Sequence, residues 1–178
     1  MDRKCIGQAV YHLPTGFTLI ELMVTIALTA LLLTVGIPSF NSLLGSMNMV
    51  SQSNEFVQAL QLARTEAVRR NQTVRLSALP TNVNSTRWEA GWQVWVDANA
   101  NDQPEEQELI RVFSANDKLK MTSQQAGMLM FAGNGAFAGR DTQSREFNLQ
   151  TVPCNGAMAR KITVSAMGQP SVQEVPCS

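Results

Sequence analysis

Histidine is almost absent from this sequence, whose single imidazole, His12, stands close to the N-terminus. Net charge is lacking as well, because 14 Lys and Arg residues balance 14 Asp and Glu residues. This balance excludes the global basic field that a nucleic-acid-binding protein usually presents. Cysteine is scarce, with three residues, and the length of 178 residues suits one domain with an extension.

One long apolar run is present, from Phe17 to Ile37, and it contains a single carboxylate, Glu21. At about 1.5 Å per helical residue, the run is long enough to cross a hydrocarbon core of roughly 30 Å. It predicts a transmembrane or filament-core helix over residues 17–45. A carboxylate inside such a helix costs about 2.5–3.5 kcal/mol, which indicates that Glu21 is functional. The small residue Gly16 precedes the run, whereas a secretory signal places its small cleavage residues after it.

The segment Gly16-Phe17-Thr18-Leu19-Ile20-Glu21 resembles the prepilin signature of type IV pilins and of type II secretion pseudopilins. The resemblance implies that a prepilin peptidase removes the leader 1–16 by cutting between Gly16 and Phe17, and then methylates the amino group of Phe17. It also implies that Glu21 pairs with the N-terminus of a neighbouring subunit during filament assembly. Removal of the leader would leave a chain without histidine, which excludes histidine-based catalysis and favours a structural protein over an enzyme.

Two cysteines, Cys154 and Cys177, remain in the part of the chain that the anchor would place outside the cytoplasm, where disulfides persist. We predict that they form a disulfide. By the chain-entropy model this bond stabilises the fold by roughly 3 kcal/mol and fixes the C-terminal tail. Two sulfurs without histidine make a poor tetrahedral ligand set, so no metal site and no cofactor is predicted.

An amphipathic helix is predicted over residues 46–71, after a bend at Gly36 and Pro38. Its apolar side chains recur on one helical face, which must be buried against the rest of the chain: Met49, Phe56, Leu60, Ala63 and Ala67. Arg69 and Arg70 close it, as cations do near a helix C-terminus. The stretch from Leu60 to Val74 resembles the corresponding part of the GspH/FimT branch of minor pilins and pseudopilins.

Strand-like patterns fill the remainder, so residues 72–178 are predicted to form a β-domain. The candidate strands are 73–78, 91–96, 108–113, 128–131, 146–149, 161–165 and 171–173. Trp92 and Trp95 fall on opposite faces of one strand, and at least one should be in the core. The predicted fold class is α+β and pilin-like: a long N-terminal helix packed on an antiparallel sheet or small β-sandwich within a globular domain 46–178.

The segment from Asp97 to Glu108 partly resembles a calcium-binding loop, with oxygen-bearing side chains at its first, third, fifth and twelfth positions. Asp102 stands where the sharp turn of such a loop requires glycine, and strands are predicted on both sides. An acidic, solvated hairpin loop is therefore the preferred interpretation.

Some pilus members of the GspH/FimT branch are linked to DNA uptake through a Gly-Arg-x-Arg motif after the last long strand. The corresponding residues here, 168–171, contain neither arginine. Because DNA contacts need cations at the phosphates, only Arg160 and Lys161 are left as candidates for weak DNA contacts.

The resemblance implies a minor pilin that takes part in type IV pilus assembly, in a priming or tip complex. A minor pseudopilin of the type II secretion pseudopilus is the first alternative, and a pilus-associated DNA receptor is the second. The implied location is the bacterial inner membrane, single-pass, with the globular domain in the periplasm. The implied partners are prepilin peptidase, other minor pilins and the major pilin (or pseudopilins), and the inner-membrane assembly platform.

Overall fold

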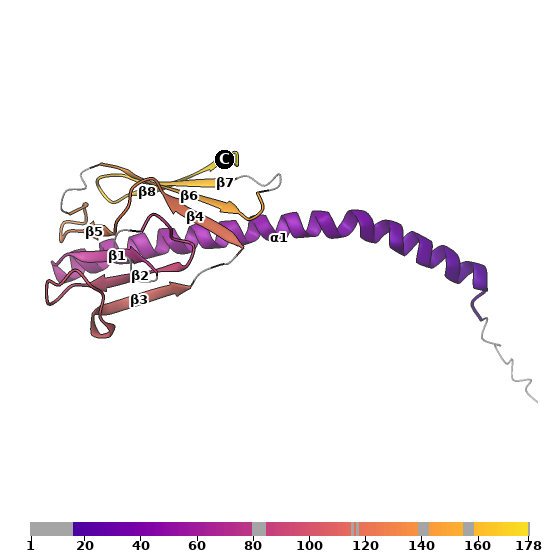
Figure 1. The fold of residues 1–178 in the computed structure, drawn as a ribbon, viewed down its shortest axis with the longest axis horizontal. Helices are drawn as coiled ribbons and strands as arrows, with labels where there is room; N and C mark the ends of the chain where they lie inside the picture. Colours follow the sequence, from indigo (N-terminus) through magenta and orange to yellow (C-terminus); the bar gives the residue numbers. More distant parts are fainter. Residues whose placement is uncertain are drawn as a thin grey trace, which may run out of the picture. The chain divides into compact units, whose positions relative to one another are not determined.

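The computed structural model describes residues 16–79, 85–114, 116, 118–138, 143–154 and 159–177, without the side chains of residues 35, 36, 38 and 39. The leader therefore lies outside the described residues, except for Gly16. The chain divides into two compact units, Met1–Ser39 and Phe40–Ser178. One helix, α1 (Leu19–Arg70), contributes to both units (Figure 1). It passes the site of the predicted bend without an interruption in its secondary structure.

The C-terminal end of α1 is closed by a C-cap at Asn71. Asn71 adopts a left-handed conformation with φ 51°, and its N–H donates to the carbonyl of Val68 at 3.3 Å. The N–H of Gln72 donates to the carbonyl of Ala67 at 3.2 Å. This pair of bonds is a Schellman motif, and asparagine is one of the residues that tolerates the left-handed position it requires.

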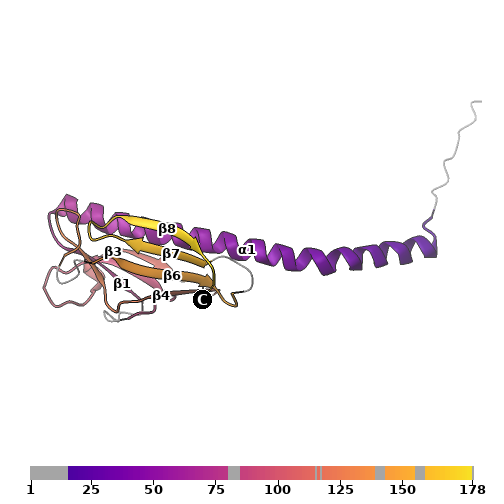
Figure 2. The ribbon, with the colours of Figure 1, turned by 90° about the horizontal axis from the view of Figure 1, so that it is seen from above.

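Within the described residues, eight strands follow the helix and form two antiparallel sheets (Figures 1 and 2). The first sheet has the order β3-β2-β1-β5 and the second has the order β4-β6-β7-β8. The strands of the first sheet are β1 (Val74–Ala78), β2 (Gly91–Val96), β3 (Leu109–Ser114) and β5 (Leu129–Phe131). Those of the second are β4 (Leu119–Ser123), β6 (Arg145–Thr151), β7 (Ala159–Val164) and β8 (Pro170–Val175), and a short 3₁₀ helix, η1 (Glu106–Glu108), precedes β3.

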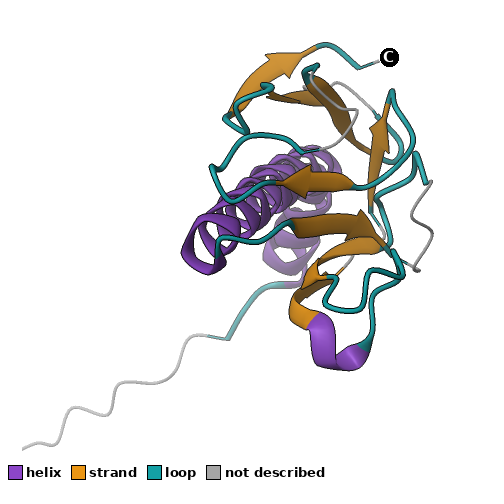
Figure 3. Ribbon diagram, turned by 90° about the vertical axis from the view of Figure 1, so that its left-hand side faces the viewer, coloured by secondary structure: helices purple, strands orange, loops and turns teal. Residues whose placement is uncertain are grey.

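Both sheets lie against the C-terminal half of α1 (Figure 3) and share one hydrophobic core with it. All five side chains of the predicted helix face are buried, with exposed fractions of 3% or less. Phe56 is at the centre of the core: its ring lies 5.0 Å from Trp92, 5.7 Å from Trp88 and 4.7 Å from Phe147, measured between centroids. These contacts join the helix to both sheets. The α+β class and the helix-on-sheet arrangement predicted from the sequence are confirmed.

The two tryptophans of β2 are both buried, on opposite faces of the first sheet. Trp92 enters the shared core, as predicted for at least one of them. Trp95 lies on the other face, where its indole N–H donates to Ser77 Oγ at 3.0 Å and the guanidinium of Arg75 lies 5.1 Å from its ring centroid. The outer face of this sheet thus carries a small buried cluster of its own.

The segment between β4 and β5 connects the second sheet to the first, and Arg145 binds it through hydrogen bonds. Its side chain is 3% exposed and donates to Gln125 Oε1 at 3.0 Å and to the carbonyls of Gly127 at 3.1 Å and Met128 at 3.3 Å. Because a buried guanidinium needs its donors satisfied, these acceptors fix the path of the crossing segment.

Candidate assembly site

The N-terminal turn of α1 is built by the residues of the predicted processing site. Thr18 precedes the first helical residue, and its Oγ1 accepts a hydrogen bond from the backbone N–H of Glu21 at 3.3 Å. Its carbonyl accepts the N–H of Leu22 at 3.2 Å. Thr18 therefore acts as the N-cap, and Glu21 is the acidic residue of the first turn, where the helix dipole favours negative charge.

Gly16 and Phe17 precede this cap and are exposed. Phe17 is 83% exposed, and a Cβ added at Gly16 would meet no heavy atom within 4 Å. Among the described residues, no cation lies within ion-pair distance of the Glu21 carboxylate. The predicted roles of Gly16, Phe17 and Glu21 in processing and assembly stay predictions.

In the unit Met1–Ser39, the described helical residues carry apolar side chains around the circumference of the helix, and these side chains are exposed. Leu19, Ile20, Met23, Leu31 and Leu32 are each more than 60% exposed. Burial of each of these side chains in an apolar environment would lower the free energy by about 1.5–3 kcal/mol. A segment with this surface needs an apolar environment outside its own chain. Among the described residues, however, no helix is both long enough and apolar enough to cross a membrane.

Polar groups within this apolar segment are satisfied locally. Thr25 Oγ1 donates to the carbonyl of Leu22 at 2.8 Å, and Thr29 Oγ1 donates to that of Thr25 at 2.7 Å. Thr25, Thr29 and Ala30 also line a shallow groove of about 290 Å³ on the helix surface. Small residues at such spacing allow the backbone of a second helix to approach closely. The groove was not predicted from the sequence, although two threonines four residues apart in an apolar run are a signal of such a surface.

The predicted disulfide is confirmed: Cys154 and Cys177 are bonded, with their Cα atoms 6.1 Å apart. The bond links the segment after β6 to the chain end after β8, which is an edge strand of the second sheet. The edge strand is thereby fastened at its C-terminal end.

The two candidate DNA-contacting residues are engaged in ion pairs on the second sheet. Arg160 donates to Glu174 at 3.0 Å across β7 and β8, and Lys161 donates to Glu146 at 3.2 Å across β7 and β6. Gly168, in the turn where the family motif begins, is buried with φ 71°, and a Cβ there would lie 2.8 Å from the carbonyl oxygen of Gly135. The turn therefore packs closely against the backbone at Gly135.

The loop with a partial calcium signature is ordered by its own hydrogen bonds and by one cation. The Asp97 carboxylate is fully buried, accepts the N–H groups of Asn101 and Asp102 at 3.1 Å each, and pairs with Arg75. Glu108 accepts the N–H of Ala98 at 2.8 Å. The described residues contain no group of three or more acidic, histidine or cysteine side chains arranged to hold a metal ion.

This loop departs from the predicted solvated hairpin in one respect. Its first carboxylate, Asp97, is inside the fold, because the guanidinium of Arg75 on the neighbouring strand neutralises it. Arg75 also donates to Asp102 at 2.6 Å. Sequence spacing gives no sign of this pairing, since the two partners are brought together only by the register of β1 and β2, in which Arg75 faces Trp95.

Two family models match the sequence. Residues 52–168 match the type II transport protein GspH family, and residues 15–37 match the prokaryotic N-terminal methylation motif. No curated protein matches the chain with significance.

Solved structures share the fold. The type IV minor pilin FimU of Pseudomonas aeruginosa is 21% identical with a TM-score of 0.56, over 69% of this chain and 90% of that protein. The minor pseudopilin EpsH of the type 2 secretion system of Vibrio cholerae is 11% identical with a TM-score of 0.53, over 71% of this chain and 96% of that protein. At such identities the likeness establishes the fold.

Proposed function

The chain belongs to the GspH family and is a subunit of the minor pilin and pseudopilin kind, and on this premise we propose that it is a minor pilin that takes part in type IV pilus assembly. Its position is a priming or tip complex, with other minor pilins and the major pilin as neighbours. The observation that carries the proposal is the exposed apolar helix with its single carboxylate, attached to a folded, disulfide-bonded β-domain. Such a helix suits packing against other helices of its kind, and the role is structural, without catalysis.

Processing precedes assembly in this proposal. A prepilin peptidase in the membrane cuts between Gly16 and Phe17 and methylates the new amino group. The processed chain, which begins at Phe17, is then held in the inner membrane by the N-terminal part of α1 as a single span, with the β-domain in the periplasm. The match of residues 15–37 to an N-terminal methylation motif supports this step. The oxidising periplasm also suits the Cys154–Cys177 disulfide.

A minor pseudopilin of the type II secretion pseudopilus is the second candidate. The family that matches residues 52–168 is described as a type II transport protein, which favours this alternative. The same processing, helix packing and assembly platform would be needed in a type IV pilus and in a type II secretion pseudopilus.

Deletion of the gene from its bacterium separates the two candidates. We expect loss of surface pili, counted by electron microscopy, with unchanged export of secreted enzymes into the medium, and restoration of pili by the wild-type chain. Loss of secretion with normal pili would refute the pilus proposal and support the pseudopilus. A chain that lacks residues 17–45 is the matched control, because it retains the whole β-domain and should restore neither activity.

The DNA-receptor alternative rests on Arg160 and Lys161 as its candidate contacts, and the charges of both side chains are already paired. We therefore expect the full-length chain in detergent to bind duplex DNA no better than the non-specific range of roughly 10⁻⁴–10⁻⁶ M at physiological salt. Fluorescence anisotropy measures this affinity. Tighter binding that is lost in the Arg160→Ala, Lys161→Ala double variant would establish the DNA role.

A further inference from the structure

Two exposed lysines lie at the end of the globular unit where α1 enters it. Gly45 of the helix contacts the last residue of β6 there, since a Cβ added at Gly45 would be 3.5 Å from Thr151 Cγ2. Strand β4 begins beside this contact, because Leu119 pairs with Thr151. Lys118 and Lys120 flank Leu119, and both are exposed. The lysines therefore lie next to the point at which the helix joins the rest of the fold.

An apolar surface accompanies the two lysines. Val152 is 58% exposed, and its N–H donates to the carbonyl of Lys118 at 3.0 Å. Val152 and Lys120 also line the same groove, of about 550 Å³. On the helix at this end, Phe40 and Leu43 are 59% and 55% exposed. We call the surface formed by Lys118, Lys120 and Val152 the base of the unit, and it combines cations with exposed apolar area.

The base carries a positive charge. Among the described residues, neither of its lysines forms an ion pair. The two other charged residues of the groove, Arg87 and Glu89, pair with each other at 2.6 Å. The helix contributes no carboxylate nearby, because residues 22–54 contain no charged side chain. Asp117 lies outside the described residues, and with its charge counted the segment 117–120 still has a net charge of +1. The complementary partner of the base is therefore anionic.

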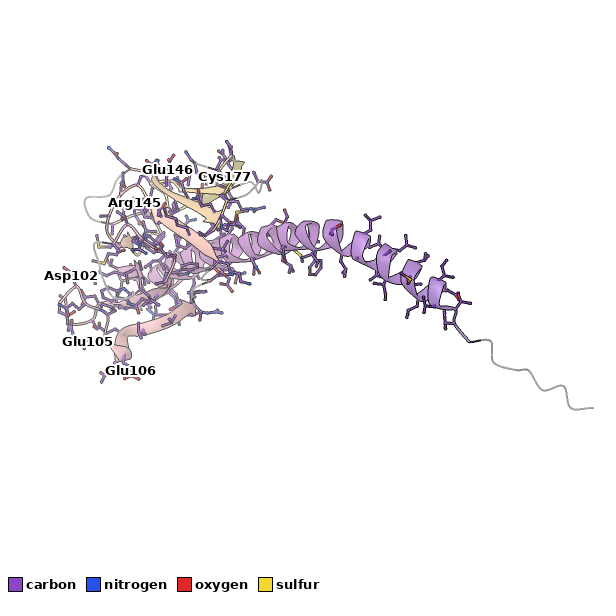
Figure 4. The ribbon with its side chains drawn as sticks, turned by 45° about the vertical axis from the view of Figure 1, so that its right-hand side comes forward. Asp102, Glu105, Glu106, Arg145, Glu146 and Cys177 are labelled. Carbon is purple, nitrogen blue, oxygen red and sulfur yellow. A yellow bond between two sulfur atoms is a disulfide. The ribbon has the colours of Figure 1, made fainter. Side chains whose placement is uncertain are left out.

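The opposite end of the unit is acidic. The loop 97–108, which we call the acidic loop, contains five carboxylates and no lysine or arginine. It follows β2, whose last residue pairs with the first residue of β1, shortly after the end of α1. Figure 4 shows Asp102, Glu105 and Glu106 of this loop far from Cys177, which is bonded to the segment next to the base. A negatively charged surface thus favours the orientation in which the base faces it.

The base lies a short length of helix from the end of the apolar run. Ile37 ends that run, and eight residues at about 1.5 Å each place Gly45 at most roughly 12 Å further along the helix. With the run in a membrane, as proposed above, the headgroup layer covers roughly 5–7 Å of this length. About 5–7 Å then remain, which is less than the Debye length of about 8 Å at physiological ionic strength. Lipid charges therefore act on the base with little screening.

We propose that the base binds the anionic phospholipid surface of the membrane in which the chain is anchored. Lys118 and Lys120 pair with lipid phosphates, and Val152 lies among the headgroups. The anchor keeps this surface beside the base at high effective concentration, whereas an acidic protein would have to be recruited. The inference rests on the proposed membrane anchoring and deepens it. The contact holds the globular unit with its acidic loop away from the membrane, and it must break when the subunit enters a filament.

Fluorescence quenching of the full-length chain in lipid vesicles tests the contact. A fluorescent amino acid is incorporated in place of Val152, and a fraction of the lipid headgroups carries a nitroxide quencher. The vesicles consist of phosphatidylcholine alone or of phosphatidylcholine mixed with phosphatidylglycerol. We expect stronger quenching in the anionic vesicles. The same amino acid in place of Glu106, on the acidic loop, is the matched control and should be quenched equally little in both.

A charge variant identifies the groups that bind the lipid. In Lys118→Gln, Lys120→Gln the ratio of docked to undocked domain in anionic vesicles should fall roughly fivefold for each lysine removed. The matched control, Arg69→Gln with Arg70→Gln, removes two exposed charges at the end of α1 and should leave the quenching unchanged. Equal quenching at position 152 in neutral and anionic vesicles, or an equal effect of the two double variants, would overturn the proposal.

The occupant of the base in cells is identified by a photoreactive amino acid at position 120. We expect adducts with phospholipid, detected by mass spectrometry. Adducts with another pilin-like chain in their place would refute the lipid surface as the partner.

Vesicle flotation separates the contact from the anchoring on which it rests. A chain that does not float with the vesicles would refute the anchor and the contact together, whereas a chain that floats without quenching at position 152 would refute the contact alone. Neither measurement requires a pilus, so the gene deletion described above decides the pilus proposal independently.

Discussion

The Arg75→Met variant tests whether the pairing of Arg75 with Asp97 organises the outer face of the first sheet. The Asp97 side chain is fully buried and the Arg75 side chain is 14% exposed. Removing one partner of a buried ion pair costs about 3–5 kcal/mol, because the other charge is left without compensation. Two backbone N–H groups still donate to Asp97, so we expect the low end, about 3 kcal/mol.

At roughly 2–4 °C per kcal/mol for a chain of this size, the expected fall in melting temperature is about 6–12 °C. The assay is unfolding of the full-length chain in detergent, followed by tryptophan fluorescence. Because the Arg75 guanidinium lies over Trp95, the variant should also change the emission of the folded state. The control is Arg111→Met, which removes a guanidinium over Phe113 and should cost about 0.5–1 kcal/mol.

The double variant Arg75→Met, Asp97→Asn decides the cause. It removes both charges, so it should be more stable than Arg75→Met alone, and the two effects should not be additive. A loss below about 1 kcal/mol in the single variant, or simple additivity in the double variant, would refute the reasoning. Addition of calcium or of a chelator should leave the wild-type melting temperature unchanged, because Arg75 already supplies the cation of the loop.

Replacing Gly16 by leucine should leave unprocessed precursor, because the proposed peptidase cuts after a small residue. Intact-mass spectrometry measures the fraction of precursor, and normal cleavage would contradict the assignment of the cleavage site to Gly16 and Phe17. Glu21→Ala should reach the membrane at the wild-type level but lower the number of pili. Glu21→Gln keeps the size of the side chain and removes its charge, so it separates loss of charge from loss of packing. Full complementation by both variants would show that the carboxylate makes no assembly contact. Hydrogen bonds from Arg69 and then Arg70 lower the pKa of Glu66 from its ordinary value of 4.5. A carboxyl with a lowered folded-state pKa stabilises the fold above its unfolded pKa, so the stability difference between wild type and Glu66→Gln should be present at neutral pH and decline as the pH falls below 4.5. Unfolding curves across this range measure it, and a pH-independent difference would exclude the ion pairs as its source.

Local patterns in the sequence determined the helix face, most of the strands and the cysteine pair. Phe56 and Leu60 are four residues apart on one face of the amphipathic part of the helix, and burial of that stripe follows from helical geometry alone. The strand from Gly91 to Val96 was predicted with the bounds that the structure has, because glycine and a run of aromatic and branched residues mark it. The strand β4 was not predicted, although Leu119 and Met121 alternate with polar residues, because the pattern covers only five residues.

The tertiary structure alone decided how these elements combine. The sequence predicts strands without saying that they divide between two sheets, since strand pairing joins residues far apart in the chain. The burial of both Trp92 and Trp95 depends on that division: one meets the helix, and the other is covered by Arg75, which belongs to a different strand. Likewise, Asp97 and Glu108 looked like solvated acids until the register of β1 and β2 placed a guanidinium beside the first of them. The charge that the acidic loop presents depends on which cation the fold places beside it, and local sequence does not contain that information.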